Sequence, residues 1–357
     1  MSTTHTNLIL AGDIGGTKVN LGIFRAGKTK PLTVIRPETF RSRSAPDLET
    51  HIKQFLDRHH IAKAIKSACF GLAGPVIKGR AKATNLPWVV SETNLQKRFG
   101  WPKVSLINDL VATALAIPLL KSTALLALNR ARVDRQGHLA VVAPGTGLGK
   151  ALVAVGTNQM VPVASEGGHV GFAPANQAQV RLWRYLHQRF DRVSQERVLS
   201  GIGLVNIYAW LRDVEAMEPA PAVEHALETA EYNAAPMITE KALAHQDSIC
   251  QRALTVFVEI FGAIAGDWAL GTMARGGVYL GGGIPPKILP VLRTGDFMAA
   301  FCAKGRFSEV VASMPVRVIL NDRAALLGAA RCALMHSAGV KKRRECRLMQ
   351  KMAAFRL

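Results

Sequence analysis

Apolar runs and stretches of helical spacing alternate along the chain. Short apolar runs that end in glycine, proline or polar residues predict strands at 66–76, 103–109, 276–286 and 314–320. Amphipathic spacing with cap residues predicts helices at 47–60, 91–100 and 323–336, and most of 181–275 has a helical pattern. Strands that alternate with helices form a parallel or mixed sheet, so ligands are expected at the carboxyl ends of its strands.

Two stretches share one pattern: LILAGDIGGTKVNLGIFRAG, residues 8–27, and LAVVAPGTGLGKALVAVGT, residues 139–157. Each has an apolar run, a glycine cluster with a threonine and a lysine, and a second apolar run, which predicts a β-hairpin with a glycine-rich tip. Glycines let successive backbone N–H groups approach an anion closely and suit phosphate oxygens. One such tip is more often a simple tight turn, but two equivalent tips favour phosphate binding.

The glycine spacing excludes two common nucleotide motifs. Gly145, Gly147 and Gly149 read G-x-G-x-G and continue into a strand-like run, whereas a dinucleotide fingerprint needs G-x-G-x-x-G before a helix. A P-loop needs glycine and serine or threonine where this chain has Pro144 and Ala151. The second tip therefore belongs to neither class.

Composition adds limits to this picture. The chain has 357 residues, 49% of them hydrophobic, so it can bury a sizeable core and is expected to form two domains. Five scattered cysteines without a C-x-x-C pair disfavour a zinc site or a disulfide framework. The longest nearly apolar run, 110–120, is too short to span a bilayer, and no secretory leader precedes it. A cytoplasmic protein without a membrane partner is expected.

The formal net charge is +20, and the segment 341–357 contributes to it with seven Lys or Arg residues against one Glu. Basic surfaces attract nucleic acids and anionic lipids non-specifically. A solvated tail is the favoured interpretation of this segment, and an anion-binding patch is the alternative. No specific nucleic-acid partner is expected.

Two similar domains that each offer a glycine hairpin resemble the sugar kinase, Hsp70 and actin superfamily. Further stretches are similar to bacterial ATP-dependent glucokinases outside the zinc-containing ROK group: LINDLVATALAIP at 106–118, SEGGHVGFAP at 165–174, QERVLSGIGLVNIY at 195–208 and GGVYLGGGIPP at 276–286. The resemblance covers roughly residues 8–335 in the order of the family.

This resemblance implies an α/β, two-domain actin-like ATPase (ribonuclease H-like) fold of the hexokinase type, with a cleft between a small and a large domain. The expected small domain comprises 1–118 plus 323–340, the large domain 119–322, and 341–357 forms a basic C-terminal tail. The resemblance also implies a homodimer.

The resemblance assigns the two tips to ATP. The phosphates are expected at Asp13, Gly15, Gly16, Thr17 and Lys18 and at Gly145, Thr146, Gly147 and Gly149, with Gly282 and Gly283 facing the adenosine. Mg²⁺ carried with ATP is the expected metal, and Asp13 is the carboxylate expected near it through water. Lys150 departs from the family pattern, and it either adds charge near the phosphates or faces solvent from an alternating strand; the second is favoured.

The resemblance places the sugar at a second group of residues. Asp109, at a strand end beside Asn108, matches the catalytic base that takes the proton of the attacking hydroxyl. The alternative is that Asp109 only caps the helix that follows it. Sugar hydroxyls are expected to bind to Asn85, Asn108, Asp109, Glu166, His169 and Glu196. A histidine like His169 helps to hold zinc in the ROK group, but the cysteine cluster needed there is absent from the sequence, so zinc is not expected.

The expected reaction is transfer of the γ-phosphoryl group of ATP to the 6-hydroxyl of D-glucose, which gives glucose 6-phosphate and ADP at the entry to glycolysis. The alternative acceptors are mannose, fructose or an N-acetylated amino sugar. A sugar-sensing regulator without catalysis is a more distant alternative, because such a protein carries a helix-turn-helix before the first hairpin, and only seven residues precede Leu8 here.

Overall fold

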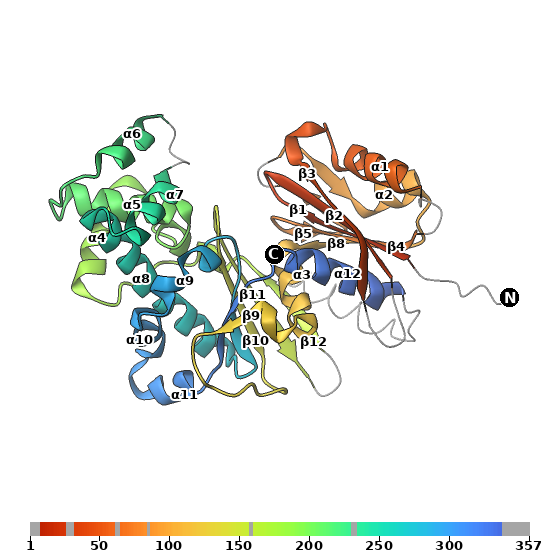
Figure 1. The fold of residues 1–357 in the computed structure, drawn as a ribbon. Helices are drawn as coiled ribbons and strands as arrows, with labels where there is room; N and C mark the ends of the chain where they lie inside the picture. Colours follow the sequence, from red (N-terminus) through yellow and green to blue (C-terminus); the bar gives the residue numbers. More distant parts are fainter. Residues whose placement is uncertain are drawn as a thin grey trace. The chain divides into compact units, whose positions relative to one another are not determined.

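The computed structural model describes residues 8–25, 32–60, 65–83, 86–156, 160–229 and 234–337. The chain divides into two compact units (Figure 1). Unit 1 contains the chain up to Ala116 and again from Ala325, and unit 2 contains Ile117–Ala324. Each unit has its own central sheet and its own hydrophobic core.

The sheet of unit 1 has five strands in the order β3-β2-β1-β4-β8. Their bounds are β1 (Leu8–Ile14), β2 (Lys18–Arg25), β3 (Thr33–Arg41), β4 (Ile65–Leu72) and β8 (Val104–Asn108). Strands β1, β4 and β8 run parallel, and β2 and β3 are antiparallel to their neighbours. A smaller sheet contains β5 (Val76–Ile77), β6 (Arg80–Lys82) and β7 (Val89–Ser91).

Helices cover both faces of this sheet (Figure 1): α1 (Leu48–His59) and α2 (Glu92–Phe99) lie on one face, and α3 (Asp109–Ala116) and α12 (Ala324–Ser337) on the other. The C-terminal helix α12 is tied to the N-terminal part of the chain. The Ser67 hydroxyl donates to the Ala333 carbonyl at 3.1 Å, and the Arg331 guanidinium donates to the Leu115 carbonyl at 2.8 Å. Helices α12 and α3 approach so closely at Gly328 that a Cβ there would lie 1.6 Å from the Ala112 oxygen.

The sheet of unit 2 has six strands in the order β12-β11-β10-β13-β14-β9. Their bounds are β9 (Leu125–Ala127), β10 (Leu139–Pro144), β11 (Leu148–Val155), β12 (Met160–Ser165), β13 (Gly277–Leu280) and β14 (Val316–Ile319). The helices are α4 (Gln177–Arg189), α5 (Gly201–Asp213), α6 (Pro221–Thr229), α7 (Ala234–Leu243), α8 (Ser248–Thr272), α9 (Leu289–Leu292), α10 (Asp296–Cys302) and α11 (Ser308–Ala312).

Helix α8 is the core helix of unit 2. Its side chains, among them Phe257 and Phe261, are buried in the main apolar cluster together with residues of α5, α7 and α10. Within the described residues it is also the one helix whose length and composition would allow it to cross a membrane, but 72% of its apolar window is buried inside the protein. Burial of this extent fits a core helix.

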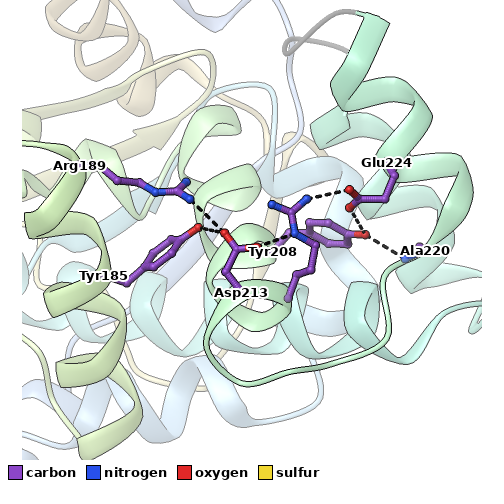
Figure 2. A network of polar contacts seen from close by, with 7 residues as sticks. Tyr185, Arg189, Tyr208, Asp213, Ala220 and Glu224 are labelled. Atoms are coloured by element: carbon purple, nitrogen blue, oxygen red, sulfur yellow. Dashed lines mark hydrogen bonds and ion pairs between the residues drawn. The ribbon is translucent and has the colours of Figure 1, made fainter.

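A polar network joins three helices of unit 2, α4, α5 and α6 (Figure 2). Asp213 accepts hydrogen bonds from Arg212 at 2.6 Å, from Arg189 at 3.0 Å and from the hydroxyl of Tyr185. Glu224 accepts from Arg212 at 2.7 Å and from Tyr208 at 3.0 Å. The network fixes α6 against α5 by directional bonds in addition to apolar packing.

The structure confirms the predicted pattern of elements. Both repeated stretches are antiparallel hairpins, β1–β2 and β10–β11. The helices predicted at 47–60, 91–100 and 323–336 are α1, α2 and α12. Helix α1 is capped by the Asp47 side chain, which accepts from the Thr50 N–H at 2.7 Å, and α2 ends at Gly100 with φ of 68°.

Candidate active site

The first hairpin tip is held by a buried serine. The Gly15 N–H donates to the Lys18 carbonyl at 2.9 Å and closes the turn. The Ser42 hydroxyl donates to the Gly15 carbonyl at 2.7 Å, and the Ser42 N–H donates to the Thr17 carbonyl at 3.0 Å. The side chains of Thr17 and Lys18 are exposed. Ser42 therefore fixes the backbone of the tip, and the hydroxyl of Thr17 and the ammonium group of Lys18 lie at its surface.

Asp13 lies at the end of β1, opposite Asn20 on β2. The Asn20 amide donates to Asp13 Oδ2 at 3.1 Å, and the Thr39 hydroxyl donates to Asn20 Oδ1 at 2.8 Å. Burial raises the pKa of Asp13 above its usual value, and the hydrogen bond from Asn20 only partly offsets this effect. The carboxylate is thus held in one orientation at a site where a nearby positive charge would be favourable.

A single oriented carboxylate fits a magnesium ion that keeps water and phosphate oxygens as its other ligands. It does not fit a metal held entirely by protein side chains. Within the described ranges no group of three or more His, Cys, Asp or Glu residues is placed to hold a metal ion.

Asn108 is the last residue of β8, and Asp109 follows it directly as the first residue of α3. Ile14 of β1 pairs with Leu72 of β4, and Leu72 pairs with Asn108 of β8, so Asp13 and Asp109 lie at the carboxyl ends of parallel strands on the same side of the sheet. Strands β1 and β8 are separated by one strand, which corresponds to about 10 Å between their backbones. A phosphate group and an acceptor hydroxyl can be accommodated over that distance.

The helix-capping role that the sequence left open for Asp109 falls mainly to its neighbour. Asn108 Oδ1 accepts from the Leu110 N–H at 2.9 Å and from the Val111 N–H at 3.3 Å. The Asn108 amide donates to the Gly74 carbonyl at 3.3 Å. Asp109 Oδ1 also lies 2.9 Å from the Leu110 nitrogen, and the Asp109 side chain is half-buried at the first turn of α3.

The second hairpin tip is a three-residue turn between β10 and β11. The Gly145 N–H donates to the Gly147 carbonyl at 2.8 Å, and the Gly145 carbonyl accepts from the Gly201 N–H at 2.8 Å. Thr146 is exposed at the top of the turn. Gly149 lies inside β11, opposite Ala143, and not in the turn.

The glycine turn after β13 lies against the base of this tip. The Gly281 N–H donates to the Val142 carbonyl at 2.9 Å. Gly282 has a φ of 82°, and a Cβ there would lie 2.4 Å from the Pro144 carbonyl oxygen, so only glycine fits. Gly282 and Gly283 are both exposed, next to the second tip.

Two short 3₁₀ turns lie beside the second tip. The first, Gly167–His169, is called the EGGH turn together with its cap residue Glu166, and the second, Gln195–Arg197, is called the QER turn. Glu166 and His169 are exposed. The Gln195 N–H donates to the Val170 carbonyl at 2.9 Å and joins the two turns. A Cβ at Gly168 would lie 1.9 Å from the Leu148 oxygen, so the EGGH turn rests directly on β11.

Glu196 has a contact that the sequence did not indicate. Its Oε2 accepts from the Leu148 N–H at 2.8 Å, directly after the second tip. A Cβ at Gly147 would lie only 2.5 Å from the same oxygen. The Ser200 hydroxyl donates to the Glu196 carbonyl at 2.7 Å and fixes the backbone of the turn. Glu196 therefore connects a predicted sugar-binding turn to a predicted phosphate-binding tip.

The prediction that Lys150 faces solvent is wrong. Its side chain is 3% exposed, its Nζ donates to Gln195 Oε1, and Nζ lies 5.1 Å from the centroid of the Trp268 ring. The same face of β11 carries the buried Leu148 and is covered by the QER turn and α8, which the alternation along one strand could not show. Burial lowers the pKa of Lys150 to about 8, and the charge of Asp267 opposes this shift.

Asn85, predicted to bind the sugar, lies outside the described residues, as does the basic tail 341–357. All the other predicted site residues are described. In unit 1 the structure brings Asp13, Asn108 and Asp109 to one sheet edge. In unit 2 it brings the second tip, the Gly282 turn, the EGGH turn and the QER turn to one end of the sheet.

Two α/β units that each present a glycine hairpin at the end of a sheet define the class of the protein: a kinase with the actin-like ATPase fold of the hexokinase type. The model of the family described as Glucokinase matches residues 10–336. The chain belongs to the glucokinase family.

The similarity to known glucokinases extends over nearly the whole chain. A glucokinase from a Nostoc species is 38% identical over 337 residues, which cover 91% of this chain and 98% of that protein. A glucokinase from a Caulobacter species is 35% identical, and the match covers 90% of this chain and 93% of that protein. The crystal structure of a glucokinase from an Antarctic psychrotroph has a TM-score of 0.80 at 29% identity, over 92% of this chain and 98% of that one. A glucokinase from Balamuthia mandrillaris shares the fold, with a TM-score of 0.74 at 22% identity, over 93% of this chain and 95% of that one.

Proposed function

We propose that this protein transfers the γ-phosphoryl group of ATP to the 6-hydroxyl of D-glucose and releases glucose 6-phosphate and ADP. Membership of the glucokinase family supports the reaction. The observation that supports the chemistry best is the common sheet edge of unit 1, where Asp109 follows β8, Asp13 lies near the end of β1 and the first hairpin tip follows β1. A candidate base and a candidate phosphate site there share one rigid scaffold.

In this proposal the two hairpin tips bind the phosphates of ATP. The N–H groups of Gly15 and Gly145 close the two turns, so the backbone donors to the phosphate oxygens are those of Gly16 and Thr17 in the first tip and of Thr146 and Gly147 in the second, and Thr17 and Thr146 add their hydroxyls. Gly282 and Gly283 lie along the adenosine. Asp13 would hold Mg²⁺ through water, and when bound this ion would neutralise negative charge on the phosphates.

The sugar hydroxyls bind to Asn108, Glu166, His169 and Glu196, and Asn85 is proposed as a further sugar ligand. Asp109 accepts the proton of the 6-hydroxyl while that oxygen forms a bond with the γ-phosphorus. The bond between the γ-phosphorus and the bridging oxygen breaks, and ADP leaves. A positioned base of this kind contributes about 10²–10⁴-fold to the rate, and the remaining acceleration comes from orientation and charge stabilisation.

A panel of hexoses tests the choice of acceptor. A site that pairs with a particular hydroxyl can reject an analogue without it by about 10⁴–10⁵-fold. With ATP and Mg²⁺, production of ADP is measured for glucose, mannose, fructose and N-acetylglucosamine. We expect the highest kcat/KM for glucose. Equal values for glucose and N-acetylglucosamine would contradict the proposal.

A cytoplasmic location, expected from the short apolar runs of the sequence, and a homodimer, implied by the family resemblance, are part of the same proposal. Sedimentation of the purified protein measures the second directly. A mass of twice 38.5 kDa is expected, and a monomer at all concentrations would contradict it.

A further inference from the structure

Lys150 is a buried cation that the proposed reaction does not use. It lies two residues beyond the start of β11, where it pairs with Ser165 of β12. A buried ammonium group is costly unless it is well paired. The hydrogen-bond acceptor of Lys150 is the neutral amide oxygen of Gln195 and not a carboxylate. No carboxylate accepts the hydrogen bond of Lys150, so the role of this buried charge is sought in the segments that Lys150 contacts.

The stem of Lys150 supports the EGGH turn. A Cβ at Gly167 would lie 2.9 Å from Lys150 Cδ, so the second residue of this turn lies directly on the lysine side chain. The Ser165 hydroxyl accepts from the Gly167 N–H at 2.9 Å and holds the turn from the neighbouring strand. The positions of Glu166 and His169 thus depend on the side chain of Lys150, on which their turn packs.

The head of Lys150 holds the QER turn. Its Nζ donates to Gln195, the residue directly before Glu196. The Gln195 backbone carbonyl accepts from the N–H groups of Val198 at 3.1 Å and Leu199 at 2.9 Å, so this residue also organises the chain that leads to α5. A displacement of Gln195 would displace Glu196 with it.

The remaining surroundings keep the ammonium group in place. The Trp268 ring lies below Nζ, and the Trp268 indole N–H donates to the Ala151 carbonyl at 3.2 Å, so the ring is itself anchored to β11. Asp267 on α8 is the charged neighbour of Lys150, and Asp267 also forms an ion pair with Lys304 at 2.8 Å.

We propose that Lys150 is a positioning residue for the kinase reaction: it fixes the EGGH and QER turns on β11, so that Glu166, His169 and Glu196 present their side chains to one sugar. This inference rests on the proposed function. It assigns Lys150 no contact with a substrate, and it predicts an effect on sugar binding that exceeds the effect on nucleotide binding.

The test compares three variants with the wild type. Lys150→Met keeps the length of the side chain below Gly167 but removes the donor, and Gln195→Leu removes the acceptor. Each is expected to raise the dissociation constant and the KM for glucose about tenfold, the size of effect typical of a lost hydrogen bond to a charged group. The KM for ATP is expected to change less than threefold. The double variant is expected to be no worse than either single variant, because both break the same contact.

Lys304→Met is the matched control. Lys304 is a largely buried lysine of the same unit that shares the neighbour Asp267 with Lys150, but its Nζ donates to the Ala263 carbonyl at 3.0 Å and holds neither turn, so it controls for the loss of a buried charge near Asp267. This variant is expected to lower the melting temperature and leave the KM for glucose unchanged. If Lys150→Met fails to fold, Gln195→Leu is used with the same expected tenfold rise.

The outcomes separate the two proposals. A wild-type protein that neither binds nor phosphorylates glucose would contradict the proposed function. A wild type that phosphorylates glucose, together with folded Lys150→Met and Gln195→Leu variants whose glucose dissociation constants are unchanged, would overturn the positioning role alone. Equal rises in the KM for glucose and for ATP would overturn it as well.

Discussion

A methyl group at Gly147 is predicted to disturb the sugar site through Glu196. In Gly147→Ala the new Cβ would lie 2.5 Å from Glu196 Oε2. Ordinary contacts begin near 3.4 Å, so the carboxylate has to move by about 1 Å. That movement lengthens its 2.8 Å bond with the Leu148 N–H beyond the range of a good hydrogen bond.

The expected loss can be worked from this one contact. A hydrogen bond to a charged group contributes about 1.5–3 kcal/mol, and the lower end applies here because Glu196 is partly exposed to solvent. A loss of about 1.5 kcal/mol lowers the melting temperature by about 3–6 °C for a unit of this size. Displacement of the carboxylate is expected to raise the KM for glucose about tenfold.

Gly145→Ala is the matched control on the same turn. A Cβ at Gly145 meets no atom within 4 Å, so the folded protein accommodates it without strain. The melting temperature is expected to stay unchanged, while the KM for ATP rises because the methyl group occupies space proposed for a phosphate. Thermal unfolding and steady-state kinetics of both variants measure these effects. Equal melting temperatures and equal KM values for glucose in the two variants would refute the reasoning.

Three further changes have defined outcomes. Burial lowers the pKa of Lys150 from 10.5 to about 8, so between these pH values the unfolded chain keeps the proton and the folded chain does not. The free energy of unfolding of the wild type, relative to that of Lys150→Met, is therefore expected to rise by about 3 kcal/mol from pH 8 to pH 10.5. Parallel urea unfolding curves at each pH measure this difference, and a difference that stays constant would contradict the prediction. The pKa of Asp213 lies below its usual value, because hydrogen bonds from Arg212 and Tyr185 outweigh the opposing effect of burial. Asp213→Asn is therefore expected to lower the free energy of unfolding by about 1–3 kcal/mol at pH 7. This loss is expected to shrink as the pH falls below 3.8 and the wild-type carboxylate takes up its proton. Gly328→Ala is expected to prevent correct packing of α12 on α3 and to lower the melting temperature by more than 10 °C, since its Cβ would lie 1.6 Å from the Ala112 oxygen; an unchanged melting temperature would show that the helices separate at little cost.

The repeated hairpins could be predicted from sequence because their signal is local. Apolar runs on both sides of a glycine cluster specify strand, turn and strand within about twenty residues. The helix caps at Asp47 and Gly100 are equally local, and the structure confirms both. Such features depend on neighbouring residues and need no knowledge of distant contacts.

Lys150 and Glu196 could not be placed in this way. The environment of Lys150 is set by Gln195 and Trp268, which lie far along the chain, and alternation on one strand carries no information about the helices that cover it. The bond from the Leu148 N–H to Glu196 likewise joins residues 48 positions apart. Asn108 shows a different difficulty, because either Asn108 or Asp109 could cap α3 and only the geometry shows that Asn108 does so with two bonds.

The most direct test of the account is the Asp109→Asn variant. Its amide is close in shape to the carboxylate but cannot take the proton of the 6-hydroxyl, so glucose is expected to bind with a dissociation constant within about threefold of the wild-type value while kcat falls by about 10²–10⁴-fold. Isothermal titration with glucose and a coupled assay with ATP and Mg²⁺ on the same preparation measure both quantities. Intact glucose binding with a kcat close to that of the wild type would contradict the central claim that Asp109 is the catalytic base.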